Sequence, residues 1–459
     1  MSSSAARKVE RKILSLLHDR STRTHLTQIH AHIIRHNLHQ SNLLLAQFIS
    51  VCGSHNRIRY AHSIFSLTQN PDLLLFNSII KGYSLSGPSQ EPLKLFYLMK
   101  SHEIWPDQFT FAPLLKSCTN ISDLNFGRQV HAEVFTVGFV SHNSIQIGLV
   151  ELYTGCDRMD DAKRMFDEMP QRDMSERTNV SWNTMIAGLA KSGREKEALE
   201  LFREMLDERF EPDDATLVTV LPVCGHLGAV ELGSWIHSYA DSRGLFQKFV
   251  QVANSVLDFY NKCGDLEMAR RVFNKMPKKS VVSWNTMITG MAFNGQGELG
   301  VKMFEEMRRQ GVDPNDATFV GTLSCCTHAG LTQKGKELFD LMIAKHRIKP
   351  RLQHYGCMVD LLGRGGCIEE AKELINKMPM SPNAAIWGAL LSACRIHGES
   401  ELAECAVKEL IRLEPQNSGN YILLSNIYAE LGKWNDVEKT RALMKEKCVL
   451  KVPGESVVI

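Results

Sequence analysis

The feature that most constrains this 459-residue chain is a long internal repeat. The hexapeptide SWNTMI occurs at residues 181–186 and again at 283–288, 102 residues later. The segments around the two copies, 179–213 and 281–315, are each 35 residues long, and 73–107 is a third copy of the same kind. Repeats of 36 and 31 residues fill the remaining interval. A period of this length is typical of a stacked array of small units.

Each repeat has the pattern of two amphipathic helices. In 179–213 the first apolar stripe consists of Trp182, Met185, Ile186 and Leu189, and the second of Ala198, Leu201, Phe202 and Met205. Ser192-Gly193 separates the two helices, and Pro212 is expected to end the second. Neither helix can bury its stripe alone, so we predict an all-α fold, an α-solenoid in which neighbouring repeats stack.

An asparagine recurs beside the first stripe, at the fifth position of several repeats. Asn183 lies about 100° around the helix from Trp182, so it faces something other than the core. The same position holds Asn77, Asn254 and Asn285. A single asparagine is commonly a helix-surface or capping residue. Recurrence in phase, each with a polar residue about 30 positions later, favours a shared functional role.

Composition excludes some classes of function. The net charge is +2, from 53 basic and 51 acidic residues, so binding of nucleic acid would depend on local geometry rather than on bulk charge. The apolar runs are too short to span a membrane. Cysteines recur with the repeat, and no Cys-x-x-Cys occurs, so we interpret them as free, buried thiols rather than metal ligands. We expect no metal site and no cofactor.

Longer signatures identify a family resemblance. They are VSWNTMI, DEMP, YNKCGDLEMARRVF, HYGCMVDLLGRGG at 354–366, AAIWGALLSACRIHG at 384–398, and the segment 418–447. With them and the alternating repeat lengths, the chain resembles plant pentatricopeptide repeat (PPR) proteins of the PLS class, E subgroup, over residues 7 to about 454. The resemblance implies a right-handed superhelix with four parts. These are a short leader, 1–6; about 10 repeats, 7–383; extension motifs similar to tetratricopeptide repeats, 384–450; and a short tail, 451–459.

The resemblance implies sequence-specific binding of single-stranded organellar RNA, one base per repeat. In the family, the fifth and last residues of a repeat read the base, and the second packs against it. The implied reading pairs are Asn77 with Asp107, Asn183 with Asp213, Asn254 with Ser280, and Asn285 with Asn315. The implied stacking residues are Leu74, Val180 and Val282. By the family's code, Asn with Asp favours U, Asn with Ser favours C, and Asn with Asn favours a pyrimidine.

Other repeats depart from this code. Their fifth residues are Ala112, Ile147, Val218, Val320 and Gly356, which cannot read a base edge in the usual way. One boundary is also irregular: the pentad MSERT, 174–178, follows MPQRD, 169–173, and is either the remnant of a deleted repeat or a loop insertion. We therefore expect a sparse, U- and C-biased binding site with several open positions.

Relatives of this class often edit C to U with a C-terminal zinc deaminase domain of the DYW type. That chemistry needs His-x-Glu and a downstream Pro-Cys-x-x-Cys. His131-Ala132-Glu133 fits the first half, but it lies inside a repeat, and His30 and His237 occupy the same phase without the glutamate. The tail LKVPGESVVI has Glu455 and Val457 where the family has Cys and Trp. We expect no deaminase domain and no enzymatic activity.

Several functional alternatives remain open. We favour an editing specificity factor that recruits a DYW-type deaminase, or another editing factor, in trans through 384–450. RNA binding for splicing, processing or stability without editing is the alternative, and a helical protein scaffold is a third. A uniform tetratricopeptide array is disfavoured by the three repeat lengths. The family and the basic, serine-containing start predict a mitochondrial location, with the chloroplast as the alternative.

Overall fold

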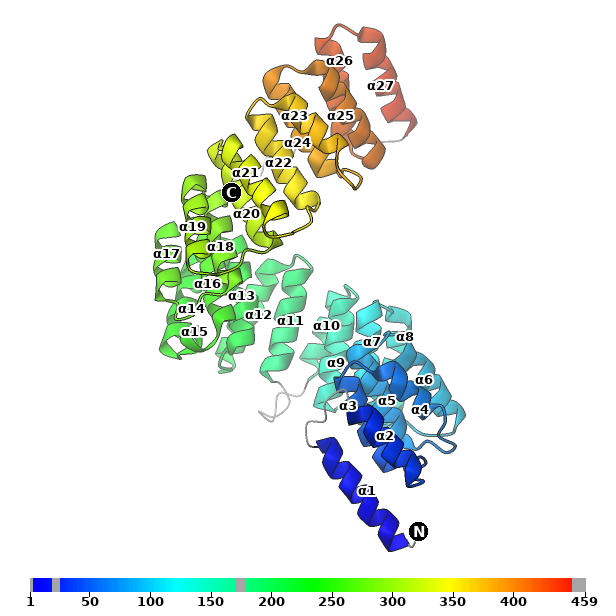
Figure 1. Ribbon diagram of the computed structural model, residues 1–459. Helices are drawn as coiled ribbons and strands as arrows, with labels where there is room; N and C mark the ends of the chain where they lie inside the picture. Colours follow the sequence, from blue (N-terminus) through cyan, green and yellow to red (C-terminus); the bar gives the residue numbers. More distant parts are fainter. Residues whose placement is uncertain (1–2, 19–24, 170–177, 448–459) are drawn as a thin grey trace. The chain divides into compact units, whose positions relative to one another are not determined.

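The computed structural model describes residues 3–18, 25–169 and 178–447, and within these ranges all regular secondary structure is α-helical (Figure 1). The chain forms two compact halves, Met1–Val223 and Cys224–Ile459, with α13 crossing the boundary between them. The described helices of the N-terminal half, with α13, are α1 Ser3–His18, α2 His25–Arg35, α3 Asn42–Ser54, α4 Ile58–Phe65, α5 Leu73–Ser86, α6 Glu91–Ser101, α7 Gln108–Ile121, α8 Leu124–Val137, α9 Asn143–Gly155, α10 Met159–Asp167, α11 Asn179–Lys191, α12 Glu195–Asp207 and α13 Asp214–His226.

The described helices of the C-terminal half are α14 Val230–Ser242, α15 Leu245–Lys248, α16 Val250–Lys262, α17 Leu266–Lys275, α18 Val281–Phe293, α19 Gly297–Arg309, α20 Asp316–Ala329, α21 Thr332–Ala344, α22 Leu352–Arg364, α23 Ile368–Asn376, α24 Ala384–His397, α25 Ser400–Leu413, α26 Ser418–Glu430 and α27 Trp434–Glu446. The predicted all-α fold is confirmed. None of the described helices is both long and apolar enough to cross a bilayer.

The helices of each half form two layers. In the N-terminal half, the first helices of successive repeats, α3, α5, α7, α9 and α11, each contact the next, and the second helices α4, α6, α8 and α10 pack against the first helix that follows (Figure 1). In the C-terminal half, α16, α18, α20, α22 and α24 contact one another in the same order. Within each half, this packing places the same face of successive first helices side by side, so residues at equivalent repeat positions form a row in that half.

The two apolar stripes of the 179–213 repeat are buried as predicted. Trp182 is fully buried and meets Phe166 of the preceding repeat edge to face, with ring centroids 4.8 Å apart. Trp284 meets Phe273 at the same centroid distance in the C-terminal half. Aromatic pairs of this geometry add to the energy of area burial. The tryptophan in each of these two repeats therefore packs against the preceding repeat and stabilises the contact between them.

Two helix boundaries differ from expectation. The second helix of the 179–213 repeat was predicted to run to Pro212, but α12 ends at Asp207, and Arg209 takes the left-handed backbone conformation with φ of 64°. The helix therefore ends before it reaches Pro212. The repeat 214–249 also contains a third, short helix, α15, which begins after Gly244 (φ 67°) and buries Phe246.

Three sequence-defined segments lie at or beyond the edge of the described residues. The irregular pentad 174–178 lies outside them except for Thr178, as does the tail 451–459. The leader 1–6 is described from Ser3, where α1 begins. Residues 384–447 form two further helix pairs, α24 with α25 and α26 with α27, which pack in sequence.

Candidate nucleic-acid interface

The four recurring asparagines occupy equivalent places on four first helices. Asn77 on α5 and Asn183 on α11 lie in the N-terminal half, and Asn254 on α16 and Asn285 on α18 lie in the C-terminal half. Each side chain is partly exposed, whereas the residue that precedes it is buried in all four cases, and in three of them it is aromatic: Phe76, Trp182 and Trp284. The helical period thus places the aromatic ring in the core and the amide at the surface of the same helix.

Asn77 is held by the last residue of its own repeat and by the third residue of the next. Its Nδ2 donates to Oδ1 of Asp107 at 2.9 Å, and its Oδ1 accepts from the hydroxyl of Thr110 at 2.6 Å. Asp107 is also the N-cap of α7, because its Oδ1 accepts from the backbone N–H groups of Phe109 and Thr110. Thr110 Oγ1 accepts in return from the backbone N–H of Asp107, which completes a capping box.

The same arrangement recurs at Asn183. Its Nδ2 donates to Asp213 Oδ1 at 3.0 Å, and its Oδ1 accepts from the hydroxyl of Thr216 at 2.7 Å. Burial of Asp213 acts to raise the pKa of its carboxyl, but hydrogen bonds from Thr216, Asn183 and Asn179 more than offset this and hold the pKa below its usual value. The carboxylate therefore stays ionised and accepts hydrogen bonds at neutral pH.

A pair of amides replaces the amide and carboxylate at Asn285. Its Nδ2 donates to Oδ1 of Asn315 at 3.1 Å, and its Oδ1 accepts from Thr318 at 2.6 Å. Asn315 caps α20 through Oδ1, which accepts from the backbone N–H of Thr318. Both amide oxygens are therefore engaged by the protein, and the amide nitrogens of Asn285 and Asn315 are the polar groups of this pair that remain able to donate.

The fourth predicted pair is connected indirectly. Asn254 Oδ1 accepts from the hydroxyl of Ser283 at 2.7 Å, and Ser283 Oγ lies 3.1 Å from Ser280 Oγ, so Ser283 bridges Asn254 to Ser280. Ser280 caps α18 by accepting from the backbone N–H of Ser283. The structure thus brings three of the four predicted pairs into direct hydrogen bonding and joins the fourth through one hydroxyl.

The residue that links each pair is not one of the residues predicted from the sequence. Thr110, Thr216, Ser283 and Thr318 are each fully buried, with 0% exposure, and each is the third residue of the following repeat. Their signal in the sequence is a hydroxyl residue three positions after the last residue of a repeat, which is the spacing of a capping box. That pattern alone predicts a helix start; it does not reveal a partner about 30 residues earlier in the chain.

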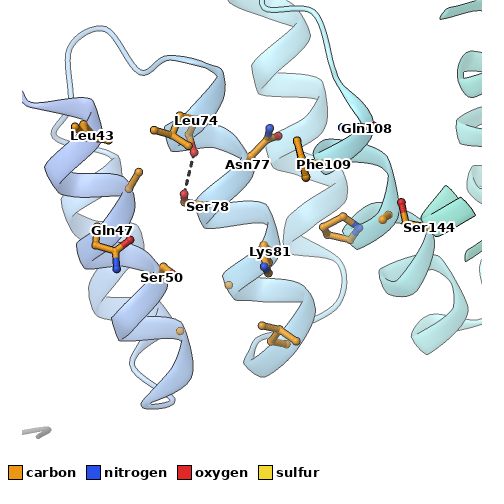
Figure 2. A pocket seen from close by; sticks show the side chains of 16 residues that line it. Leu43, Gln47, Ser50, Leu74, Asn77, Ser78, Lys81, Gln108, Phe109 and Ser144 are labelled. Carbon is orange, nitrogen blue, oxygen red and sulfur yellow. Dashed lines mark hydrogen bonds between the residues drawn. The ribbon is translucent and has the colours of Figure 1, made fainter. Parts of the chain in front are cut away.

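The predicted stacking residues lie exposed beside the reading positions. Leu74, Val180 and Val282 have exposed fractions of 47%, 54% and 56%, so each has an apolar surface available to a ligand. Around Asn77 the surface is hollowed into a cavity of about 500 Å³, lined on one side by Leu74 and on the other by Phe109 (Figure 2). Asn77 points from α5 toward Phe109 at the start of α7, and Lys81 lies one turn further along α5 (Figure 2).

Phe109 is a second residue of the site that was not predicted from the sequence. Its side chain is 66% exposed. Phe109 is the second residue of its repeat, as Leu74 is of the preceding repeat, so the two side chains occupy equivalent positions on either side of the cavity. A planar base placed in the cavity would meet an aliphatic wall on one face and an aromatic ring on the other. Stacking on aromatic rings is a common way for proteins to hold single-stranded bases.

The apolar fifth residues leave the reading positions of their repeats without an amide. At Ile147 the rest of the site is present: Thr178 precedes α11, and Ser181 holds the third position. Ser181 Oγ donates to the backbone oxygen of Thr178 at 2.9 Å, and the buried Thr178 Oγ1 has no hydrogen-bond partner among the described residues. In the C-terminal half, Val320 and Gly356 line a separate cavity of about 580 Å³.

The His-x-Glu match belongs to the repeat rather than to a zinc site. His131 Nδ1 lies 2.8 Å from the hydroxyl of Tyr153, and His30 with Tyr60 and His237 with Tyr260 form the same pair. Burial lowers the pKa of His131, which keeps the ring neutral. Glu133 forms an ion pair with Lys100 at 2.9 Å. These contacts assign His131 and Glu133 to packing between helices.

Three of the recurring cysteines are buried thiols, as predicted, whereas Cys156 and Cys263, which also recur in phase, are only partly buried. Cys118, Cys224 and Cys326 are each 0% exposed, and burial raises the pKa of Cys118 to about 12 and that of Cys326 to about 11. Thiols of this kind are poor nucleophiles and poor metal ligands. Among the described residues, no group of three or more His, Cys, Asp or Glu side chains is arranged to hold a metal ion.

Family models match along most of the array. The PPR repeat family model matches residues 177–226 and 279–328, and the PPR repeat model matches 75–104, 148–174, 252–281, 318–346 and 354–381. The E motif model matches residues 397–459.

Curated relatives match over nearly the whole chain. A pentatricopeptide repeat-containing protein of Arabidopsis thaliana is 52% identical over 482 residues, covering 98% of this chain and 99% of the relative. A second from the same plant, named chloroplastic, is 40% identical and covers 96% of this chain and 77% of the relative. A third, named mitochondrial, is 38% identical, and the match covers 90% of this chain and 89% of the relative.

A solved structure has the same fold. The pentatricopeptide repeat protein PPR10, crystallised in complex with an 18-nt psaJ RNA element, aligns with a TM-score of 0.54 over 93% of this chain and 73% of that one. The sequence identity is 16%, so the likeness concerns the path of the backbone. The helical-repeat architecture inferred from the sequence is confirmed by this comparison.

Proposed function

This chain belongs to the pentatricopeptide repeat family, and from that premise we propose that it binds single-stranded organellar RNA and reads a sparse set of its bases. The observation that carries the proposal is the recurring pair at the fifth and last positions, held in one geometry at Asn77, Asn183 and Asn285. A hydrogen-bonded pair that is partly exposed, flanked by exposed apolar side chains and repeated in phase suits a row of stacked bases.

The hydrogen-bonding groups of each pair match a particular base edge. At Asn77, one N–H of the amide is engaged by Asp107, and the hydrogen bonds that described residues make to Asp107 all use Oδ1. The second amide N–H and the second carboxylate oxygen, Oδ2, can then serve a ligand. Uracil presents a carbonyl acceptor beside an N3–H donor, which complements one donor and one acceptor. At the Asn183 pair, Asn183 and Thr216 likewise bind Oδ1 of Asp213, and Asn179 is a further hydrogen-bond donor to this carboxylate.

The other two pairs favour different edges. Asn285 with Asn315 offers donors, which suits the acceptor atoms N3 and O2 of cytosine or the carbonyls of uracil. Asn254 with Ser280 offers an amide N–H and a hydroxyl, and we assign it to cytosine. The flanking Leu74, Val180 and Val282 pack against the base faces in this proposal, and Phe109 adds an aromatic wall at the Asn77 position.

The chemistry on the RNA is assigned to a partner. We propose that the chain is a specificity factor for C-to-U editing and that residues 384–450 recruit a DYW-type deaminase in trans. The match of the E motif model to residues 397–459 supports a role for this region beyond base reading. The alternative is RNA binding for splicing, processing or stability without editing, in which 384–450 would contact other factors.

The first experiment is selection from a random single-stranded RNA pool with the purified full chain. Enrichment of U opposite Asn77 and Asn183, and of C or U opposite Asn254 and Asn285, is the expected result. The matched control is the double variant Asn77→Ala, Asn183→Ala, which should lose the two U preferences and keep the others. Retention of arbitrary RNA without any enriched base would refute base reading and support a protein scaffold.

A second experiment separates editing from other RNA functions. RNA that carries the selected motif with a cytidine downstream is incubated with the full chain and a separately supplied deaminase of the DYW type. Conversion to uridine that requires the motif supports the editing role, whereas tight binding without conversion favours the alternative. A fluorescent fusion of the full chain in plant cells distinguishes a mitochondrial location, which we propose, from a chloroplast one.

A further inference from the structure

We infer that the buried hydroxyl at the third position of the following repeat is a positioning residue that selects which atoms of the reading asparagine face the RNA. The inference rests on the proposed base-reading function and concerns Thr110, Thr216, Ser283 and Thr318. None of these side chains is exposed, so none can touch a base itself. Their effect on recognition would pass through the asparagine amide.

The hydroxyl distinguishes the two ends of the amide. In all four sites it donates to the asparagine Oδ1, at distances of 2.6, 2.7, 2.7 and 2.6 Å in chain order. It also accepts from the backbone N–H of the last residue, at 3.1, 3.2, 3.1 and 3.0 Å. Three of the hydroxyls have a second possible acceptor, Oδ1 of Asp107, Asp213 or Asn315, at 3.0, 2.8 and 3.0 Å, but the asparagine Oδ1 is the nearer one in each case. A hydroxyl proton at these distances is met by the oxygen end of the amide, because the NH₂ end has no lone pair to accept it.

Fixing the oxygen end directs the nitrogen end toward the ligand. An amide that could rotate by 180° would present either a donor or an acceptor to a base, and its discrimination between uracil and cytosine would be averaged. This matters most at Asn254, where Ser283 supplies the side chain's described hydrogen bond. If the amide turned its NH₂ end toward the buried hydroxyl, the hydroxyl would lose this acceptor. Leaving a buried donor without an acceptor costs free energy, so the orientation with Oδ1 toward the hydroxyl is preferred.

The Ile147 site is a natural comparison within the same chain. It keeps the hydroxyl residues Thr178 and Ser181, and the Thr178 Oγ1 atom is buried without a described partner, yet the fifth residue is an isoleucine. The Ala112 site has an apolar fifth residue as well, but its last and third residues are His142 and Ile145, and neither is a hydroxyl residue. The two sites therefore differ in whether the surroundings could orient an introduced amide.

The first test compares Thr216→Val with Thr216→Ser in the full chain. Dissociation constants are measured for four RNAs that differ only in the nucleotide opposite Asn183. We expect Thr216→Val to lower the preference for U at that nucleotide about tenfold, and Thr216→Ser to retain it. Preferences at the other nucleotides should be unchanged, because each hydroxyl contacts one asparagine. A general loss of folding would instead weaken binding to all four RNAs equally.

The outcomes are separable from failure of the proposed function. If the wild-type chain shows no preference at any nucleotide, base reading itself is wrong. If the wild type prefers U and Thr216→Val keeps that preference, or loses affinity for all four RNAs alike while Thr216→Ser does not rescue it, the positioning role is refuted.

The second test is a gain of function. Ile147→Asn should create a new preference at one further nucleotide, for the same base that the Asn254 site prefers, because Thr178 with Ser181 resembles Ser280 with Ser283. Ala112→Asn, the matched control, should create none. Equal gains in both variants, or no gain in a folded Ile147→Asn chain, would overturn the inference. Thermal melting of each variant establishes whether it is folded. If Ile147→Asn does not fold, the comparison of Thr216→Val with Thr216→Ser still tests the inference.

Discussion

One side-chain oxygen of Asp213 has two structural tasks. It accepts from the backbone N–H of Thr216, which starts α13, and from the amide of Asn183, which lies on the preceding first helix. The residue that is proposed to contact a base is therefore also the residue that begins the next repeat. Local folding and recognition are coupled at this atom, and substitutions here can be chosen to separate the two.

Asp213→Asn should change recognition without a large loss of stability. Asparagine caps helices as well as aspartate does, and Asn315 already fills the same role at α20. The loss of the carboxylate removes the acceptor for uracil N3–H, so the preference for U over C opposite Asn183 should fall about tenfold. Dissociation constants for RNAs that differ at this nucleotide measure it.

Asp123→Asn is the matched control for that substitution. Asp123 caps α8 by accepting from the backbone N–H of Phe126, but it is not the last residue of a repeat. Both variants change an aspartate N-cap to asparagine, and only Asp213→Asn should alter base preference. A shift in preference of similar size in both would assign the effect to capping instead.

The lowered pKa of Asp213 also predicts a dependence of stability on pH. A carboxyl whose pKa is lower in the folded chain than in the unfolded one stabilises the fold above the unfolded pKa of about 4, and this stabilisation is lost as the pH falls through the folded pKa. The urea midpoint of the wild type should therefore drop more steeply between about pH 6 and pH 3 than that of Asp213→Asn. Parallel curves for the two chains would contradict this assignment.

At the scale of helices, contacts between neighbouring repeats hold the array together. Trp182 is fully buried against Phe166 of the preceding repeat, so its truncation removes a contact between two repeats rather than within one. Trp182→Ala should destabilise the N-terminal half by about 3–5 kcal/mol. Trp105→Ala, at a tryptophan that is 79% exposed, should change stability by less than about 0.5 kcal/mol.

The Trp182 prediction is best measured locally, because repeat arrays need not unfold in one step. Hydrogen exchange of the α10 and α11 amides should accelerate in Trp182→Ala, while α3 and α5 are less affected. Uniform acceleration along the whole N-terminal half would indicate that this half unfolds as one cooperative unit.

Two glycines give opposite predictions for the same substitution. A methyl group on Gly297 would lie 2.2 Å from the backbone oxygen of Cys325, where neither α19 nor α20 can easily move, so Gly297→Ala should destabilise the fold by about 1–3 kcal/mol. Gly388 lies within α24 with no atom within 4 Å of such a methyl group, so Gly388→Ala should stabilise it by about 0.5–1 kcal/mol. Urea midpoints of the two variants should move in opposite directions.

The helices were predictable from sequence because their signal is periodic and local. Trp182, Met185, Ile186 and Leu189 are all buried, as their spacing indicated. The predicted end of α12 was wrong because the helix ends before Arg209, which has a left-handed backbone conformation that the sequence does not indicate. The short α15 was missed because a four-residue helix has no period to detect.

The candidate site was predictable in part. The family pattern pointed to Asn183 and Asp213, and the structure joins them at 3.0 Å. The role of Thr216 was not apparent because its hydrogen bond reaches 33 residues back along the chain. Such a contact depends on how two repeats stack, and the sequence of either repeat alone describes only its own helices.

At the scale of the whole molecule, a near-neutral charge limits how the chain can hold RNA. With a net charge of +2, the chain as a whole has little attraction for the phosphate backbone, and base contacts must supply the discrimination. Raising the salt concentration from about 50 to 200 mM should weaken binding of matched and mismatched RNAs by the same factor. The ratio of their dissociation constants should stay constant. A ratio that falls with salt would show that ion pairs contribute to selectivity.

The capping role of the last residue also limits how such a protein can change its target over evolutionary time. A substitution at the last position changes the base preference at little cost to folding when the new residue still caps the next helix, and Asp, Asn, Ser and Thr are the side chains that do this well. This chain uses all four before its first helices, at Asp213, Asn315, Ser280 and Thr178. Drift among them is nearly neutral for folding, so new RNA targets can be explored without passing through an unfolded intermediate.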